Sequence, residues 1–231
     1  RRTDTIFNEI AREQEILRDR VDAIVRELND MLREDEEAMH RQVLSRSWEM
    51  EDEKPDPLAV NAVGCTLIAL SIGTRLKLPN YQLFNLGVSA LLHDIGMKRI
   101  PASIRYKKGK LDPREFKAIQ NHLVYSYLTI KNDLSYYKEI AEYALYHHEN
   151  WDGTGYPRKV GGEKIPVQAR IISVADAYIA MVSERPYSGR LSGYIALRTI
   201  ISNNGKRFDP SVVQALVASI GLYPIGSVVK L

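Results

Sequence analysis

The chain places histidines and aspartates in apolar surroundings, a combination that points to metal chemistry. His93 and Asp94 are adjacent, behind an apolar stretch and in front of Gly96. Asp94 is a poor core residue, because an unpaired buried carboxylate costs several kcal/mol or more. Hard and borderline cations accept carboxylate oxygen and imidazole nitrogen together, so the pair is a candidate metal ligand. Taken alone, the dipeptide leaves a metal site and an ordinary core histidine equally open.

Further candidate ligands follow, each on or at the end of an apolar helical stretch. His122 lies in one such stretch, His147 and His148 stand where another runs into a Gly-rich loop, and Asp176 interrupts a third. An isolated His–His pair would more often divide between core and solvent, because adjacent residues differ by about 100° around a helix. Two acids and four imidazoles together predict a dinuclear site in a helical core. Such a site suits phosphoester hydrolysis, and the two oxygens of a carboxylate such as Asp94 can bridge both cations.

Composition limits the partners and the setting. The 231 residues allow one large or two small domains, and the 45% of hydrophobic residues suffices for a core. A net charge of +3 without a strongly basic tract gives no case for duplex nucleic acid as a partner. Cys65 is the single cysteine, which excludes an intrachain disulfide and fits a reducing compartment. No apolar run of roughly 18 residues and no signal peptide are visible, so we predict a cytoplasmic protein without a membrane span in this chain.

The first part of the chain is predicted to be one long helix over residues 5–47. Apolar or neutral residues recur there with alternating gaps of three and four, at Phe7, Ile10, Gln14, Leu17, Val21, Ile24, Leu28 and Met31. This is the spacing of a coiled-coil seam, so we predict a homodimer through this helix. An amphipathic helix packed on its own domain remains an open alternative. Residues 1–50 are accordingly interpreted as a signalling or dimerisation helix and residues 51–231 as a separate domain.

The remaining pattern is helical throughout. Helices are predicted over residues 58–76, 80–95, 112–122, 135–148 and 167–183, with two more beginning near Ser192 and Asp209. The run Asp112-Pro113-Arg114-Glu115 is a strong helix start, with a capping Asp and a Glu three residues later. Residues 101–110 and 150–166 are predicted loops, and residues 226–231 are expected to be extended. The fold class is therefore all-α, a bundle of roughly eight to ten helices.

The ordered set of candidate ligands resembles the signature of the HD superfamily of metal-dependent phosphohydrolases. The run HHENWDGTGYP over residues 147–157 is similar to the HHExxDGxGYP motif of the HD-GYP subfamily, and residues 165–166, 169–171, 175–177, 185–187 and 208–210 continue the match. The resemblance covers about residues 58–216. It implies an HD-domain helical bundle and a bacterial signal-transduction phosphodiesterase that hydrolyses cyclic di-GMP to linear pGpG and/or GMP. It also implies two divalent metal ions, most often iron or manganese, and an upstream sensory or receiver domain absent from this chain.

The same resemblance assigns roles to individual residues. One metal would be held by His93, Asp94 and Asp176, and the other by Asp94, His122, His147 and His148. Tyr156, Gly155 and Arg185 would contact the dinucleotide. A guanidinium suits a phosphate or a guanine edge, although Arg185 could equally form a surface salt bridge and Tyr156 could serve loop packing. Gly155 also suits a tight turn of the loop.

The chain departs from the family pattern at several positions. Asn61 stands where the family has a histidine ligand, and its carbonyl oxygen would be a weaker metal ligand. Met97 replaces a lysine that contacts phosphate, with Lys98 one place off as the candidate proton donor. Ser188 replaces a further basic residue. Pro57 occupies the position of an acid found in some members, for which the neighbouring Asp56 is a candidate substitute, and a third metal is not expected.

These departures leave two main hypotheses for function. The first is a cyclic di-GMP phosphodiesterase weakened by the loss of one histidine ligand. The second is a catalytically impaired domain that binds cyclic di-GMP or a protein as a signalling module. An HD enzyme for a different nucleotide is disfavoured by the Gly155-Tyr156-Pro157 loop.

Overall fold

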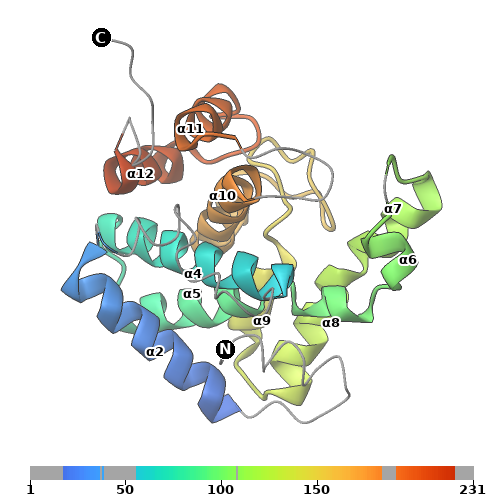
Figure 1. Cartoon of the computed structure of the whole chain (residues 1–231), viewed down its shortest axis with the longest axis horizontal. Helices are drawn as coiled ribbons and strands as arrows, with labels where there is room; N and C mark the ends of the chain where they lie inside the picture. The colour runs from blue at the N-terminus through green and yellow to red at the C-terminus, as the bar shows by residue number, and fades with distance from the viewer. Residues whose placement is uncertain (1–17, 37, 39–55, 108, 184–190, 222–231) are drawn as a thin grey trace, which may run out of the picture.

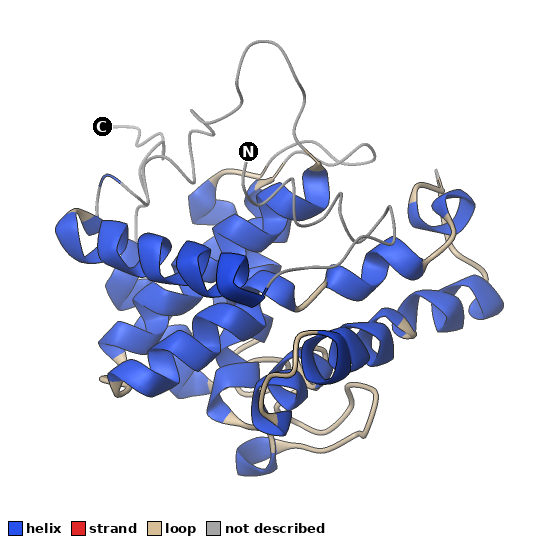
Figure 2. Ribbon diagram, turned by 90° about the horizontal axis from the view of Figure 1, so that it is seen from below, coloured by secondary structure: helices blue, strands red, loops and turns tan. Residues whose placement is uncertain are grey.

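The computed structural model describes residues 18–36, 38, 56–107, 109–183 and 191–221. These residues form a bundle of helices without a β-strand, which confirms the predicted all-α class (Figures 1 and 2). The α-helices are α2 (Arg18–Glu34), α4 (Pro57–Arg75), α5 (Asn80–Leu92), α6 (Ala102–Arg105), α7 (Pro113–Gln120), α8 (His122–Leu128), α9 (Lys138–Leu145), α10 (Val167–Val182), α11 (Gly193–Ser202) and α12 (Pro210–Ile220).

Helix α4 is the central helix of the bundle and packs against α5, α10 and α12. Asp56 caps its start by accepting a hydrogen bond from the Leu58 amide at 2.9 Å, and Pro57 occupies the first helical position. By length and mean hydropathy (1.6), α4 is the one described helix that could cross a membrane, but 72% of that window is buried within the domain. Its apolar character is therefore explained by its place in the core.

Helix α2 lies along α4 and α5 (Figure 1). Val21, Ile24, Val25 and Leu32 are buried there, whereas Met31 is 39% exposed. Two residues of the proposed coiled-coil seam, Val21 and Ile24, thus pack against the domain itself. This is the arrangement expected for the alternative, an amphipathic helix that packs on its own domain. The seam positions from Phe7 to Leu17 and the division at residue 50 lie outside the described residues, so the homodimer and the two-domain division stay predictions.

The helix expected to continue to Ile95 ends earlier, at Leu92. Beyond it, residues Ile95–Arg99 form a 3₁₀ turn, η1, because the chain at Gly96 passes directly against α8. The Gly96 amide donates to Ser126 Oγ at 3.0 Å, and a Cβ on Gly96 would collide with the backbone of His122 and Ser126. This close approach brings the residues after α5 beside those that begin α8.

Most other helix limits follow the sequence prediction. The capping box of Asp112 and Glu115 starts α7, Ser192 caps α11 and Asp209 caps α12. Within the predicted loop 101–110 the chain forms the short helix α6. Pro79 occupies the N-cap position of α5, and the Asn80 side chain accepts a hydrogen bond from Arg33 at 2.8 Å.

Candidate metal centre

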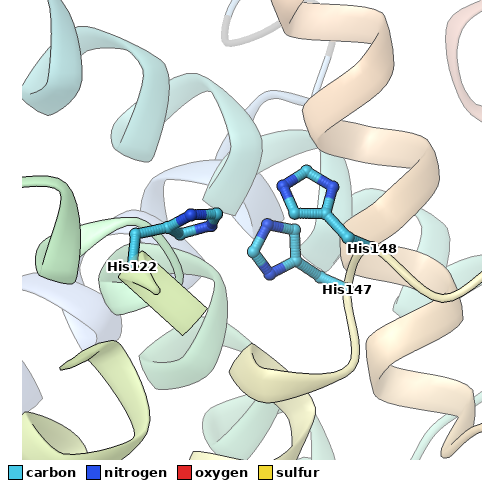
Figure 3. A group of neighbouring side chains, drawn as sticks. All are labelled: His122, His147 and His148. Atoms are coloured by element: carbon cyan, nitrogen blue, oxygen red, sulfur yellow. The ribbon is translucent and has the colours of Figure 1, made fainter. Parts of the chain in front are cut away.

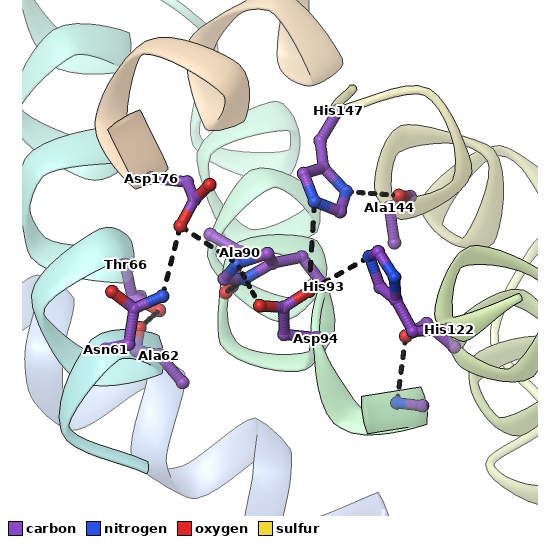
Figure 4. A network of polar contacts seen from close by, with 12 residues as sticks. Asn61, Ala62, Thr66, Ala90, His93, Asp94, His122, Ala144, His147 and Asp176 are labelled. Atoms are coloured by element: carbon purple, nitrogen blue, oxygen red, sulfur yellow. Dashed lines mark hydrogen bonds and ion pairs between the residues drawn. The ribbon is translucent and has the colours of Figure 1, made fainter. Parts of the chain in front are cut away.

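Three histidines present their Nε2 atoms to one another in the middle of the bundle. In each, Nδ1 contacts the carbonyl oxygen three residues earlier at 2.7 Å: His93 with Ala90, His122 with Ile119 and His147 with Ala144 (Figure 4). A carbonyl only accepts, so Nδ1 carries a proton, and in the neutral imidazole Nε2 keeps a lone pair. All three Nε2 atoms are buried without a hydrogen-bond partner among the described residues. Buried lone pairs that converge without a donor are what a cation satisfies.

Asp94 lies between these imidazoles and uses its two oxygens on different sides. Its Oδ1 is 3.2 Å from His122 Nε2 and 3.8 Å from His147 Nε2, while Oδ2 is 3.6 Å from His93 Nε2. Two ligand atoms that each lie about 2.1 Å from one ion can be at most about 4.2 Å apart, and all three separations are below this limit. The geometry therefore fits a carboxylate that bridges two cations.

The remaining predicted ligands lie at the edges of this centre. The ligand atoms of His122, His147 and His148 are within 4.8 Å of one another (Figure 3), as are those of His93, Asp94 and His147. Asp176 reaches the centre from α10, with Oδ1 at 3.7 Å from His93 Nε2. The structure thus brings together all six residues assigned to the two metals. His147 belongs to both groups of neighbouring ligand atoms, the one with His122 and His148 and the one with His93 and Asp94.

The electrostatics of the centre favour a positive charge between the carboxylates. Burial lowers the pKa of His93, but Asp94 and Asp176 outweigh it and raise that pKa to about 9. Burial lowers the pKa of His148 to about 4, so its imidazole is neutral at neutral pH. The pKa of Asp176 is lowered although burial opposes this, because His93 stabilises the carboxylate. A bound cation would supply the same charge without a proton.

A buried glutamate shapes the loop that follows the histidines. Glu149 is 2% exposed, and its carboxylate accepts hydrogen bonds from the backbone amides of Arg158, Lys159 and Val160. Gly155 is buried against the backbone of residues 148–150, where a Cβ would collide. These contacts close the loop on itself. Whether Gly155 also contacts a ligand stays a prediction.

The closed loop places Tyr156 beside His148, at one edge of the centre. The Tyr156 amide donates to the His148 carbonyl at 3.1 Å, and the two rings lie 5.0 Å apart at 31°. Phe116 of α7 meets Tyr156 edge-to-face at 6.1 Å and is 47% exposed. Sequence analysis missed Phe116, because only tertiary structure brings α7 beside the loop. Tyr156 thus stands beside the candidate ligands, as its predicted role requires.

A family model described as an HD domain matches residues 23–212. The chain belongs to the HD domain family. A cyclic di-GMP phosphodiesterase of Pseudomonas aeruginosa is 34% identical over 172 residues, which cover 74% of this chain and 41% of that protein. A cyclic di-GMP phosphodiesterase of Thermotoga maritima is 42% identical over 130 residues, 56% of this chain and 35% of the relative. The 3'3'-cGAMP-specific phosphodiesterase 3 of Vibrio cholerae is 41% identical over 136 residues, 59% of this chain and 29% of the relative.

Solved structures show the same fold. An HDG"Y"P protein from Bdellovibrio bacteriovorus has a TM-score of 0.68 at 14% identity, over 93% of this chain and 66% of that one. A cyclic GMP-AMP-specific phosphodiesterase of Vibrio cholerae has a TM-score of 0.53 at 19% identity, over 78% of this chain and 47% of that one. The HD-GYP resemblance is therefore confirmed. This HD domain spans less than half the length of each of the three relatives above.

Two residues predicted to depart from the family pattern, Asn61 and Lys98, have definite contacts in this HD domain. Asn61 donates from Nδ2 to Asp176 Oδ1 at 3.1 Å, so it contacts a candidate ligand through its amide nitrogen (Figure 4). Lys98 is largely buried and pairs with Asp56, the residue that caps α4. Asp56 is thereby engaged by an ammonium group and a helix amide. The roles assigned to Asn61 as a ligand and to Lys98 as a proton donor stay predictions.

A second buried ion pair, Arg170 with Asp209, lies against Trp151 of the Gly-rich loop. Arg170 of α10 contacts Asp209 at 2.5 Å and lies over the Trp151 ring, while Asp209 caps α12 through the Ser211 amide. The pair links two of the matched sequence segments, 169–171 and 208–210, that seemed unrelated in the sequence. Arg185, Tyr187 and Ser188 lie outside the described residues.

Proposed function

We propose that this HD domain is a metal-dependent phosphodiesterase that hydrolyses cyclic di-GMP to linear pGpG and/or GMP. One observation carries the reaction class: three buried imidazoles, each with Nδ1 bound to a carbonyl, converge through Nε2 on the two oxygens of Asp94. The names of the relatives support the substrate class, a cyclic dinucleotide.

Two divalent cations, iron or manganese, would be held by His93, Asp94 and Asp176 at one position, and by Asp94, His122, His147 and His148 at the other. When bound, they would supply the Lewis acidity that polarises the phosphodiester and activates water. His147 and His148 are neutral before any cation arrives, because burial lowers the pKa of both rings.

The surrounding residues would orient the reactants. Asn61 donates a hydrogen bond from its side-chain nitrogen to the carboxylate of Asp176 and so positions that candidate ligand. The nitrogen itself would not coordinate a metal. Tyr156 lies at one edge of the centre, and with Arg185 it would contact the dinucleotide. The buried pair of Lys98 with Asp56 fixes η1 to the start of α4, on the side of the centre where Asn61 also lies.

The alternative is an impaired domain that binds cyclic di-GMP or a protein partner and signals without turnover. Its support is also structural. The amide nitrogen of Asn61 is directed at Asp176, and the ammonium of Lys98 is occupied by Asp56, so neither group is free to serve the substrate in this arrangement. Weak hydrolysis is the version of the proposal that accounts for both the six candidate ligands and these substitutions.

The test is a time course of cyclic di-GMP with protein purified without oxygen and supplied with manganese or iron. The proposal predicts slow conversion to pGpG or GMP that disappears in His122→Ala, while Asp133→Asn, which changes an exposed acid, retains it. Bound metal with binding but no conversion would establish the signalling alternative. Absence of both binding and conversion would overturn the assignment to cyclic di-GMP.

We further propose that the N-terminal helix forms a homodimer, that a sensory or receiver domain precedes it in the whole protein, and that the protein is cytoplasmic. Met31 supports the dimer, because this seam position is exposed on α2 rather than packed in the domain. A charge at Ile24 would not test the dimer, because Ile24 is buried against its own domain and the change would disrupt the fold. Met31→Asp combined with Leu17→Asp should lower the mass measured by light scattering, and an unchanged mass would retire the dimer.

A further inference from the structure

A pocket of about 480 Å³ opens beside the candidate metal centre. His148 and Asp176 line one side of it, so the pocket and the centre share a wall. The other side comes from α11 and the turn that follows, with Thr199, Asn203 and Arg207. Pockets of this size accommodate small ligands. A phosphodiester placed at the centre would therefore have an attached nucleoside within reach of this space.

Arg207 has a fixed backbone and a charge that no residue of the described part of the chain pairs. Its carbonyl accepts from the Trp151 amide at 3.0 Å, and its amide donates to the Asn203 carbonyl at 3.0 Å, which ties the turn after α11 to the Gly-rich loop (Figure 1). Its guanidinium forms no ion pair with any described residue, and its Cζ lies 4.9 Å from the Phe208 ring centroid. Arginine presents planar donors suited to a phosphate or to the O6 and N7 atoms of guanine.

The other two polar residues offer acceptors rather than donors. Thr199 Oγ1 donates to the Ile195 carbonyl at 2.9 Å. Asn203 Nδ2 donates to the Thr199 carbonyl at 2.9 Å and to Ser202 Oγ at 3.3 Å, which uses both amide hydrogens. The Thr199 hydroxyl and Asn203 Oδ1 therefore keep acceptor capacity on the same rim as Arg207.

The remaining lining suits the faces of a flat ring. Ala177, Ala180, Met181 and Phe208 line the pocket with apolar groups. Apolar and aromatic walls with a few placed polar groups are the usual design of sites that bind a purine or a similar ring.

We propose that this pocket holds one guanine base of the cyclic dinucleotide and that Arg207 selects guanine over adenine. Guanine presents acceptors at O6 and N7 to the guanidinium, and its N1–H and N2 amino group are donors that match the Thr199 and Asn203 oxygens. Adenine carries an amino donor at position 6, which would face the donors of Arg207. Its N1 is an acceptor, which would face the acceptor oxygens of Thr199 and Asn203. The inference rests on the proposed function, because it takes a cyclic dinucleotide as the substrate.

The experiment measures binding to the manganese-loaded protein of phosphorothioate cyclic di-GMP and cyclic di-AMP, analogues that resist hydrolysis. We expect wild type to prefer the guanine ligand. Arg207→Ala should weaken cyclic di-GMP binding roughly tenfold or more and leave cyclic di-AMP binding unchanged, since one bidentate contact is lost. Arg207→Lys keeps the charge but not the planar fork, so it should lose most of the preference. Arg198→Ala, on α11 but outside the pocket lining, is the matched control.

The outcomes separate the two proposals. If Arg207→Ala binds both ligands like wild type, the inference is overturned while the proposed function stands. If Arg207→Ala weakens both ligands equally, Arg207 contacts phosphate and the base selection is overturned. If wild type binds neither ligand, the proposed function itself fails. Thr199→Val, which keeps the side-chain shape without the hydroxyl, should weaken cyclic di-GMP binding independently and guards against a folding defect in the arginine variants.

Discussion

Asn61 Nδ2 donates a hydrogen bond to Asp176 Oδ1 at 3.1 Å, in the wall of the candidate metal centre. Asn61, predicted to stand where the family has a histidine, therefore steadies a candidate ligand on the adjacent helix α10. The hydrogen bond holds the Asp176 carboxylate in place beside the other candidate ligands.

Restoring the family residues should raise the rate. Asn61→His adds an imidazole beside Asp176. Met97→Lys adds an ammonium group that is not engaged by Asp56, whereas the ammonium of Lys98 is. We expect the double variant to hydrolyse cyclic di-GMP roughly tenfold faster or more, since one general acid–base group contributes at least this much. Steady-state rates with manganese check it, with Asn61→Ala as the comparison. Equal rates for wild type and the double variant would place the deficit elsewhere.

Metal affinity should rise with pH. The pKa of His93 is raised to about 9, so below that pH a cation must displace a proton from this ring. Between about pH 6 and pH 9, affinity for manganese should increase by up to tenfold per pH unit for each displaced proton. Competition with a chelating indicator measures it. A flat profile over this range would contradict the prediction.

The free energy of unfolding of the metal-free protein should fall as pH rises. The pKa of His93 is higher in the folded chain than in the unfolded chain, where it is about 6.5. Such a histidine stabilises the fold most when the pH is low enough for it to be protonated in both states. That contribution is fully present below about pH 6.5 and is lost as pH rises through about 9. Urea unfolding of chelator-treated protein at pH 6.5 and pH 9 should show the decrease, and His93→Gln should abolish this part of it.

Glu149→Gln should loosen the loop that carries Tyr156. The buried carboxylate accepts from three backbone amides, and a neutral amide oxygen accepts more weakly. We expect a loss of about 1–3 kcal/mol in the free energy of unfolding. Hydrogen exchange at residues 158–160 should accelerate as well. Glu163→Gln, an exposed acid in the same loop, is the control, and equal effects of the two changes would argue against the role of Glu149.

Breaking the Arg170–Asp209 pair should destabilise the domain strongly. Asp209 is 4% exposed and also caps α12, so Asp209→Ala leaves Arg170 with an uncompensated charge. The expected cost is about 3–5 kcal/mol by chemical denaturation. Asp133→Ala removes the exposed partner of Arg99 and should cost about 0–1 kcal/mol. A small effect at Asp209 would show that solvent or other groups compensate the charge.

The sequence could predict which residues gather at the candidate metal centre because buried acids and imidazoles need partners, and His93, Asp94, His122 and Asp176 stand in or at the ends of apolar helices. In the structure these side chains lie close together. What the sequence could not predict depends on contacts between distant segments: the carbonyl partners of the imidazoles, the pairing of Lys98 with Asp56, and the approach of Phe116 to the loop.

Two differences in the fold have the same origin. Helix α5 ends at Leu92 because Gly96 packs on the backbone of α8, a contact that local helical periodicity does not reveal. The spacing of α2 fits a coiled-coil seam and a domain-packed helix equally, and in the described part Val21 and Ile24 pack on the domain. Periodicity identifies an apolar face but not its partner.

Asp94 is proposed to join two cations between these imidazoles, and a calorimetric titration of metal-free protein with manganese measures how many ions bind. Wild type should bind two ions per chain. Asp94→Asn, which keeps the size of the side chain but removes its charge, should bind both ions more weakly. Binding of no ion to the wild type, or an unchanged titration in Asp94→Asn, would contradict it.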